Sequence, residues 1–132
     1  MKTYALRLEP GQDLRLNLEA FAQQQAIAAG FVLTAVGSLR VATLRFAGRA
    51  VATAIDGPCE LLSLSGLLSA QGAHLHGAIA CTDGRVLGGH IALGCIIYTT
   101  AEIVMGDCPN LCFRRELDPQ TGYRELAIDT QA

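Results

Sequence analysis

The chain has 132 residues, of which 51% are hydrophobic and 17% are charged, and its formal net charge at pH 7 is −2. A chain of this length is expected to fold as one domain with its own core. The slight excess of acidic side chains argues against strong electrostatic binding of nucleic acid, because such binding needs a basic patch or stripe. No apolar run approaches the ~20 residues that span a bilayer, and the charged N-terminal segment is not typical of a signal peptide. Five cysteines, an odd number, favour reduced thiols, so we predict a cytoplasmic protein without a membrane partner.

The first part of the chain predicts a strand, a helix and three further strands. Residues 3–9 alternate apolar and polar side chains, as a half-buried strand does. Asp13 is a plausible N-cap for a helix over Leu14–Ala29, and Gly30 is the expected glycine at its C-terminal end. Residues 31–36 predict the next strand, which we expect to end at residues 37–38. Two more strands are predicted over residues 41–47 and 49–55, followed by a turn at residues 56–58.

Three arginines, Arg40, Arg45 and Arg49, are close together in this part of the sequence. The common explanation for such a group is a solvated face. A contact with a phosphate or a carboxylate is the alternative, and the sequence leaves it open.

A hairpin between residues 71 and 93 holds every histidine of the chain, His74, His76 and His90. Side chains alternate across a strand, so His74 and His76 are expected on one face. A three-residue loop, with Gly84 in the left-handed conformation, would pair His90 directly with His76 and bring all three imidazoles together. A two-residue turn would instead place His90 on the opposite face. We expect the first register, with Leu75, Ile79, Leu87, Ile91 and Leu93 on the core face.

Three neutral imidazoles above small side chains such as Ala78, Ala80 and Gly88 suit a divalent metal with one open position. A lone histidine on a strand is usually a satisfied polar residue. Three that converge across one hairpin favour a site, so we predict that His74, His76 and His90 bind zinc or another divalent metal.

The remaining segments add short strands on either side of this hairpin. Residues 61–69 alternate serine and leucine, which predicts a half-buried strand with Leu62 and Leu64 on the core face. Residues 95–104 predict another strand, in which Glu102 is either at the surface or partly buried with a partner. Residues 111–117 and 123–128 predict two strands around a turn. One principal N-terminal helix among short strands predicts an α+β fold, mainly of antiparallel sheet.

Six segments together resemble the plants-and-prokaryotes-conserved (PPC) domain family across nearly the whole chain. In order, they are YALRLEPGQDL, AVGSL, ELLSLSGLLS, GAHLHGAIACTDGRVLGGHIALGC, TTAEIV and FRRELDPQTGYREL. The resemblance implies a single PPC domain over residues 1–132, a fold similar to those of AF0104 and acetolactate decarboxylase, and assembly as a homotrimer. Plant members are nuclear DNA-binding proteins with AT-hook segments, whereas stand-alone bacterial members have no settled role. Acetolactate decarboxylase uses histidine-bound zinc in an equivalent region, which favours the same three histidines here.

Three functions remain open from the sequence. The first is a trimeric metal-binding protein with a regulatory or DNA-associated role, although no Arg-Gly-Arg-Pro core of an AT-hook occurs and direct DNA binding is not favoured. The second is a zinc-dependent lyase or hydrolase for a small molecule, in which Glu102 would be the general acid or base and Arg114 or Arg40 would hold a carboxylate. The third is a structural trimer whose histidines belong to the core. No nucleophile motif, phosphate loop or dinucleotide fingerprint is present.

Overall fold

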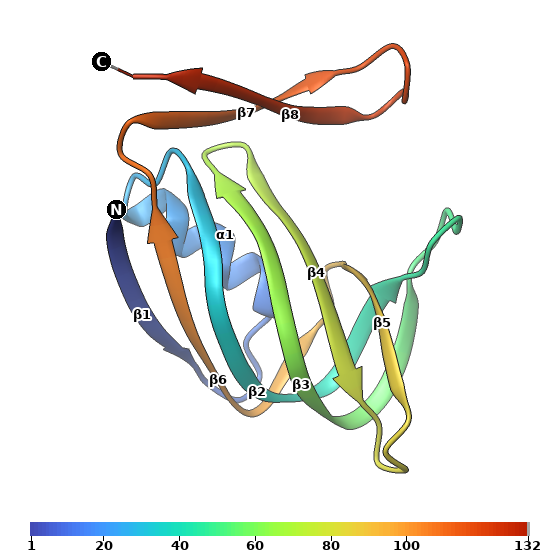
Figure 1. The fold of residues 1–132 in the computed structure, drawn as a ribbon. Coiled ribbons are helices and arrows are strands. Elements are labelled where there is room, and N and C mark those ends of the chain that lie inside the picture. Colours follow the sequence, from blue (N-terminus) through green and yellow to red (C-terminus); the bar gives the residue numbers. More distant parts are fainter. Residues whose placement is uncertain (132) are drawn as a thin grey trace.

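The computed structural model of the protein describes residues 1–131, which form one helix, a six-stranded sheet and a separate two-stranded sheet (Figure 1). The elements are β1 (Lys2–Leu8), α1 (Leu14–Gln24), β2 (Gly30–Arg45), β3 (Thr53–Ser69), β4 (Gly72–Ala80), β5 (Val86–Ile91), β6 (Ile96–Asp107), β7 (Leu111–Leu117) and β8 (Arg124–Thr130). This confirms the predicted α+β class with mainly antiparallel strands. The helix of the described residues lacks the length and apolar character that a membrane crossing needs.

The large sheet has the strand order β1-β6-β2-β3-β4-β5, and all of its pairings are antiparallel. The end of β2 also pairs with β5, through Leu44 with Ile91 and Arg45 with His90. Because β2 is long and strongly curved, its end reaches the edge strand β5, although its neighbours along the rest of its length are β6 and β3 (Figure 1). The large sheet is therefore partly closed. The closure brings the end of β2 beside the β4–β5 hairpin, which carries the three histidines.

The hydrophobic core lies between α1 and the curved sheet. Leu14, Leu18 and Ala22 form the buried stripe of the helix, at the four-residue spacing of one helical face. They belong to one buried cluster with sheet residues such as Leu75 and Ile91. One face of β4 and β5 therefore packs into the core, and their opposite face points outward and carries polar side chains.

The β7–β8 hairpin lies across one end of the large sheet (Figure 1). A backbone bond from Phe113 N to Ala28 O (2.9 Å), and one from Cys108 N in the preceding loop to Ala29 O (3.0 Å), attach it to the segment between α1 and β2. A third bond, from Arg115 N to Gln71 Oε1 (2.6 Å), attaches it to the β3–β4 turn. Since two-stranded hairpins are marginal alone, these links decide where β7 and β8 sit.

The helix ends earlier than the sequence predicts. Asp13 is its N-cap, as expected, and accepts a bond from Leu16 N (2.9 Å), but the helix stops at Gln24 and not at Ala29. Ala26 takes a left-handed conformation with φ 53°, which reverses the chain and lets Ile27 enter the core. Gly30 begins β2 and does not cap the helix. A glycine is needed there for close packing, since a Cβ would lie 2.7 Å from the Ile27 side chain.

Two predicted breaks in the strands are also wrong. Residues 37–38 and residues 56–58 lie inside β2 and β3, which are continuous. Gly37 is needed for close packing and not for a turn, since a Cβ there would lie 2.3 Å from Thr100 O on β6. A register shift between Leu61 and Ser63 in the pairing of β3 with β4 leaves Leu62 exposed on the outer face. The prediction that Leu62 faces the core is therefore wrong, whereas Leu64 is buried as predicted.

Candidate metal centre

The β4–β5 hairpin has the three-residue loop that the sequence predicts. Cys81 N donates to Arg85 O (2.8 Å), and Gly84 N donates to Cys81 O (2.9 Å). Gly84 has a φ of 83°, which side chains with a Cβ rarely adopt. This loop sets the register that pairs His76 with His90 directly, and that prediction is confirmed.

All three imidazoles lie on the outward side of this hairpin. The ring centroids are 5.0 Å apart for His74 and His76, 5.4 Å for His74 and His90, and 5.6 Å for His76 and His90. One ring nitrogen from each histidine lies within 4.8 Å of the others. Leu75, Ile79 and Ile91 point into the core, as predicted, whereas Leu93 is exposed because β5 ends at Ile91.

His90 is the most enclosed of the three histidines. Its Nδ1 is buried and has no hydrogen-bond partner among the described residues. Burial, and then the nearby positive charge of Arg45, lower the pKa of His90 to about 4. Burial and the charge of Arg115 lower the pKa of His74 as well. Both rings are therefore neutral at pH 7, which is the form that binds metals.

These three residues fit a divalent metal ion. Tetrahedral zinc with Zn–N bonds of about 2.0–2.1 Å needs nitrogens roughly 3.3 Å apart, which small side-chain rotations can reach from the present spacing. An unpartnered buried nitrogen is costly unless a ligand satisfies it, and that nitrogen belongs to His90. Imidazole suits zinc, copper, nickel and iron, so the donor set does not choose among these metals by itself.

A pocket of about 480 Å³ opens beside His74 and His90. It lies where the ends of β2, β4 and β5 meet the start of α1 and the β7–β8 hairpin. The charged side chains that line it are Arg15, Arg45, Arg115, Arg124 and Glu125. A metal ion bound by the three histidines would therefore lie next to this pocket. A ligand in the pocket could then occupy an open coordination position of that ion.

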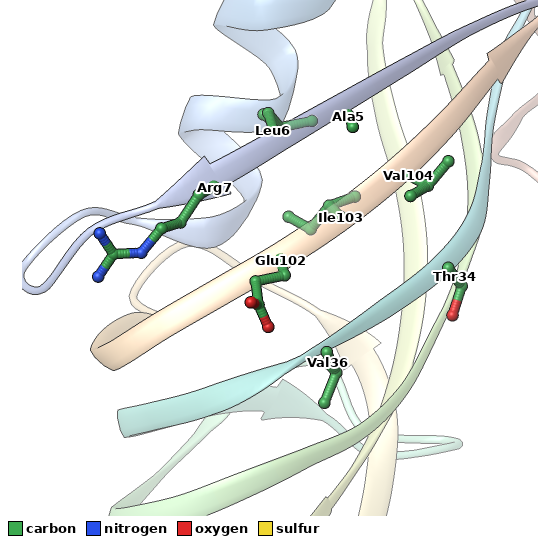
Figure 2. A pocket seen from close by; sticks show the side chains of 8 residues that line it. All are labelled: Ala5, Leu6, Arg7, Thr34, Val36, Glu102, Ile103 and Val104. Atoms are coloured by element: carbon green, nitrogen blue, oxygen red, sulfur yellow. The ribbon is translucent and has the colours of Figure 1, made fainter.

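The structure does not bring Glu102 to this pocket. Glu102 is exposed on β6, and β2 and β3 lie between β6 and β4, the strand of His74 and His76. Figure 2 shows it in a different hollow, with Arg7 of β1 and Val36 of β2. Its predicted catalytic role stays a prediction that the placement does not favour.

The structure places Arg114 and Arg40 outside the pocket lining as well. Arg114 donates to Asp129 through its Nη2 (3.0 Å), which ties β7 to β8, and it also contacts Glu116 on its own strand. These two carboxylates raise the pKa of Arg114 further. Arg40 is exposed on β2. The role predicted for Arg114 or Arg40 in holding a carboxylate therefore stays a prediction.

The sequence argument did not single out Arg15, Arg115 and Arg124, which line the pocket together with Arg45. Arg115 follows Arg114 directly, and strand alternation turns the two to opposite sides, so that Arg115 faces the pocket. Arg15 lies on the first turn of α1, where nothing local marks it. Arg45 was part of the basic group, but only the pairing of Arg45 with His90 shows where it lies.

Comparisons with known proteins agree with the sequence resemblance. The family model of the Plants and Prokaryotes Conserved (PCC) domain, which is the PPC domain above, matches residues 1–109. A bifunctional protein named GlmU from Synechococcus sp. (strain JA-3-3Ab) is 52% identical over 132 residues, which are 100% of this chain. The chain spans 21% of the length of that relative, and the same is true of the GlmU of strain JA-2-3B'a(2-13).

Solved structures share the whole fold. A hypothetical protein from Salmonella cholerae-suis (Salmonella enterica) has a TM-score of 0.96 and 41% identity, covering 99% of this chain and 95% of that chain. The metal-containing protein AF0104 from Archaeoglobus fulgidus has a TM-score of 0.80 and 28% identity, covering 96% and 94%. A candidate DNA-binding protein from Ralstonia eutropha JMP134 has a TM-score of 0.77 and 25% identity, covering 94% and 90%. With the family model matching most of its length, the chain belongs to the Plants and Prokaryotes Conserved domain family.

Proposed function

We propose that this chain is a metal-binding PPC-domain protein that holds one divalent ion, zinc first among the candidates, through His74, His76 and His90. The observation that carries the proposal is the convergence of the three ring nitrogens within 4.8 Å of one another. Two further facts support it. The Nδ1 of His90 is buried with no hydrogen-bond partner among residues 1–131, and a similar structure is described as metal-containing.

The three imidazoles would leave a coordination position open towards the pocket. A zinc ion held by three protein ligands supplies a Lewis acid that polarises a bound carbonyl or phosphoryl oxygen. The chain itself supplies the rigid placement. Leu75 and Ile91 are locked in the core beside the histidines, and the loop at Gly84 fixes the register between the two strands.

We also propose that the protein is a homotrimer. The outer face of the large sheet, which α1 does not cover, carries exposed apolar side chains: Leu33 is 47% exposed, Val36 57% and Leu62 51%. The hollow in Figure 2, of about 420 Å³, has apolar side chains from β1, β6 and β2 along its walls. Exposed apolar strand surface of this kind is usually buried in an interface. The β7–β8 hairpin, with exposed Leu117 and Ile128, adds a second surface for assembly.

For the physiological role we favour a regulatory or DNA-associated function in the cytoplasm. Its support is the likeness to the candidate DNA-binding protein from Ralstonia eutropha. Zinc-dependent catalysis on a small molecule is the second candidate. The observation that favours this second function is the pocket of about 480 Å³ beside His74 and His90, which is within the usual size range of small-molecule sites.

Elemental analysis tests the metal proposal. The protein is loaded with zinc, passed through a desalting column and analysed beside a sample treated with a chelator. We expect one zinc ion per chain in the first sample, and a higher melting temperature than in the second, because a ligand of the native state stabilises it. No retained zinc, nickel, cobalt or copper after the same loading would contradict the proposal.

A further inference from the structure

The pocket beside the histidines has an excess of positive charge. Four arginines line it, Arg15, Arg45, Arg115 and Arg124, and the only carboxylate in the lining is that of Glu125. Arg15 is neutralised by an ion pair with Glu19 (2.9 Å). Among residues 1–131, no carboxylate forms an ion pair with Arg45, Arg115 or Arg124. Repulsion between like charges in one hollow raises the free energy of the folded protein, and a bound anion would relieve this repulsion.

Arg45 is placed by the sheet itself. It is the direct cross-strand partner of His90, so the two side chains leave the same face and neighbour each other. The main-chain O of Arg49 accepts a bond from Arg45 Nη1 (3.3 Å), and no other group in the described part of the chain accepts a bond from this guanidinium. An anion that contacts Arg45 is therefore also close to the ring of His90.

Arg15 and Arg115 are placed by bonds from neighbouring elements. Glu19 accepts from Arg15 and, through the same oxygen, from the backbone N–H of Ala73 (3.1 Å), which holds Arg15 against the start of β4. The side chain of Gln71 accepts from Arg115 N (2.6 Å), which holds Arg115 at the edge of the pocket. The two arginines come from opposite ends of the chain, yet line one pocket with His74.

We infer that this pocket binds a small oxyanion, a carboxylate or a phosphate group on a small molecule, through Arg45 and Arg115, with Arg15 in support. A volume of about 480 Å³ suits a small metabolite. Guanidinium groups bind both kinds of oxyanion through paired N–H donors. Binding of this ligand to the arginines does not depend on the metal site proposed above. Contact of the same ligand with a metal ion does depend on it.

Duplex DNA is the less suitable occupant of this pocket. The arginines lie in a hollow that the β7–β8 hairpin borders, and Glu125 of that hairpin lies in the same lining. A duplex backbone instead needs a basic stripe that follows its phosphates along the surface. The chain as a whole has a net charge of −2, which does not provide one.

Isothermal titration calorimetry tests the inference with zinc-loaded and metal-free protein. The probes are inorganic phosphate, succinate and the uncharged succinamide, at ~0.15 M ionic strength. We expect the wild type to bind phosphate or succinate, but not succinamide. Arg45→Gln and Arg115→Gln should each weaken that binding at least about tenfold, with unchanged metal content. Arg85→Gln is the control, because Arg85 is an exposed arginine at the β4–β5 loop, far along the hairpin from His90.

The outcomes separate this inference from the metal proposal. Anion binding by metal-free protein that the two variants lose supports the inference, even if no metal binds. One metal per chain without anion binding up to ~10 mM overturns the inference and leaves the metal proposal standing. Anion affinities equal in wild type, Arg45→Gln and Arg115→Gln overturn it too. So does tight binding of a labelled duplex, lost in both variants, if neither small anion binds.

Discussion

His90 on β5 and Arg45 on β2 are direct partners in the short antiparallel pairing that closes the large sheet. His90 is at the same time the partner of His76 on β4, so three polar side chains lie in one row across three strands. The row exists only because β2 is long enough to reach β5. Closure of the sheet therefore places a positive charge beside the candidate metal ligands.

Gly89 makes this closure sensitive to a single methyl group. A Cβ at Gly89 would lie 2.7 Å from Arg45 O, so Gly89→Ala must displace the end of β2. We expect a loss of about 1–3 kcal/mol in the free energy of unfolding, and weaker metal binding, because His90 moves with its strand. Urea denaturation and a zinc titration measure both effects.

Gly48→Ala is the control for that change. Gly48 follows β2 and has open space around its Cβ position, although its φ is 73°. Its substitution should cost only about 1 kcal/mol and leave zinc affinity unchanged. Equal zinc affinities in the wild type and Gly89→Ala would show that the β2–β5 closure does not hold His90.

The stability of the metal-free protein should depend on pH through His90. The folded state lowers the pKa of His90 to about 4, mainly by burial, while in the unfolded chain it is near 6.5. Below pH 6.5 the unfolded chain therefore binds a proton that the folded one does not, so stability falls as the pH drops from 6.5 towards 4. Between pH 7 and 4.5, the melting temperature of the wild type should fall more than that of His90→Gln. Parallel curves for the two proteins would be the contrary result.

Assembly as a trimer can be measured directly. Light scattering should give three times the mass of the 13.9 kDa chain at micromolar concentration. Val36→Arg places a charge on the apolar outer face and should shift the mass towards the monomer. Val86→Arg is a matched control, because Val86 is 56% exposed and Val36 57%, but Val86 lies at the β4–β5 loop end of the sheet. A wild-type mass of one chain would end the proposal.

Duplex DNA should bind weakly, if at all, at ~0.15 M salt. The basic group Arg40, Arg45 and Arg49 is divided in the structure, and Arg114 of β7 has carboxylate partners of its own. Arg40 is exposed on β2, Arg45 lines the pocket, and Arg114 is paired with Asp129 and Glu116. A titration of labelled duplex with the wild type and the Arg45→Ala, Arg49→Ala double variant measures the effect. Sub-micromolar binding that the double variant loses would favour a direct DNA-binding role instead.

The sequence alone was sufficient for features that depend on neighbouring residues. The cap at Asp13 and the loop at Gly84 follow from local backbone chemistry, and that loop alone brings His76 and His90 together. The resemblance to the PPC family, which was also found from short sequence segments, is confirmed by the family model over residues 1–109.

Features that depend on distant strands were not predictable in this way. Gly37 was expected to break a strand, yet it permits the close approach of β6, which is some sixty residues away along the chain. The end of α1 depends on Ile27 entering the core, and not on a glycine cap. The arginine lining of the pocket depends on closure by β2 and on the position of the β7–β8 hairpin, neither of which has a local signature.

Zinc titration of the histidine variants tests the central claim most directly. Calorimetry compares the wild type, His74→Gln, His76→Gln and His90→Gln with Ser65→Ala, whose residue lies on β3 opposite His76. The wild type and Ser65→Ala should bind one zinc ion per chain, and each histidine variant should bind at least about tenfold more weakly, since one of three ligands is missing. Zinc affinity that is equal in the wild type and all three histidine variants would contradict a metal centre at this hairpin.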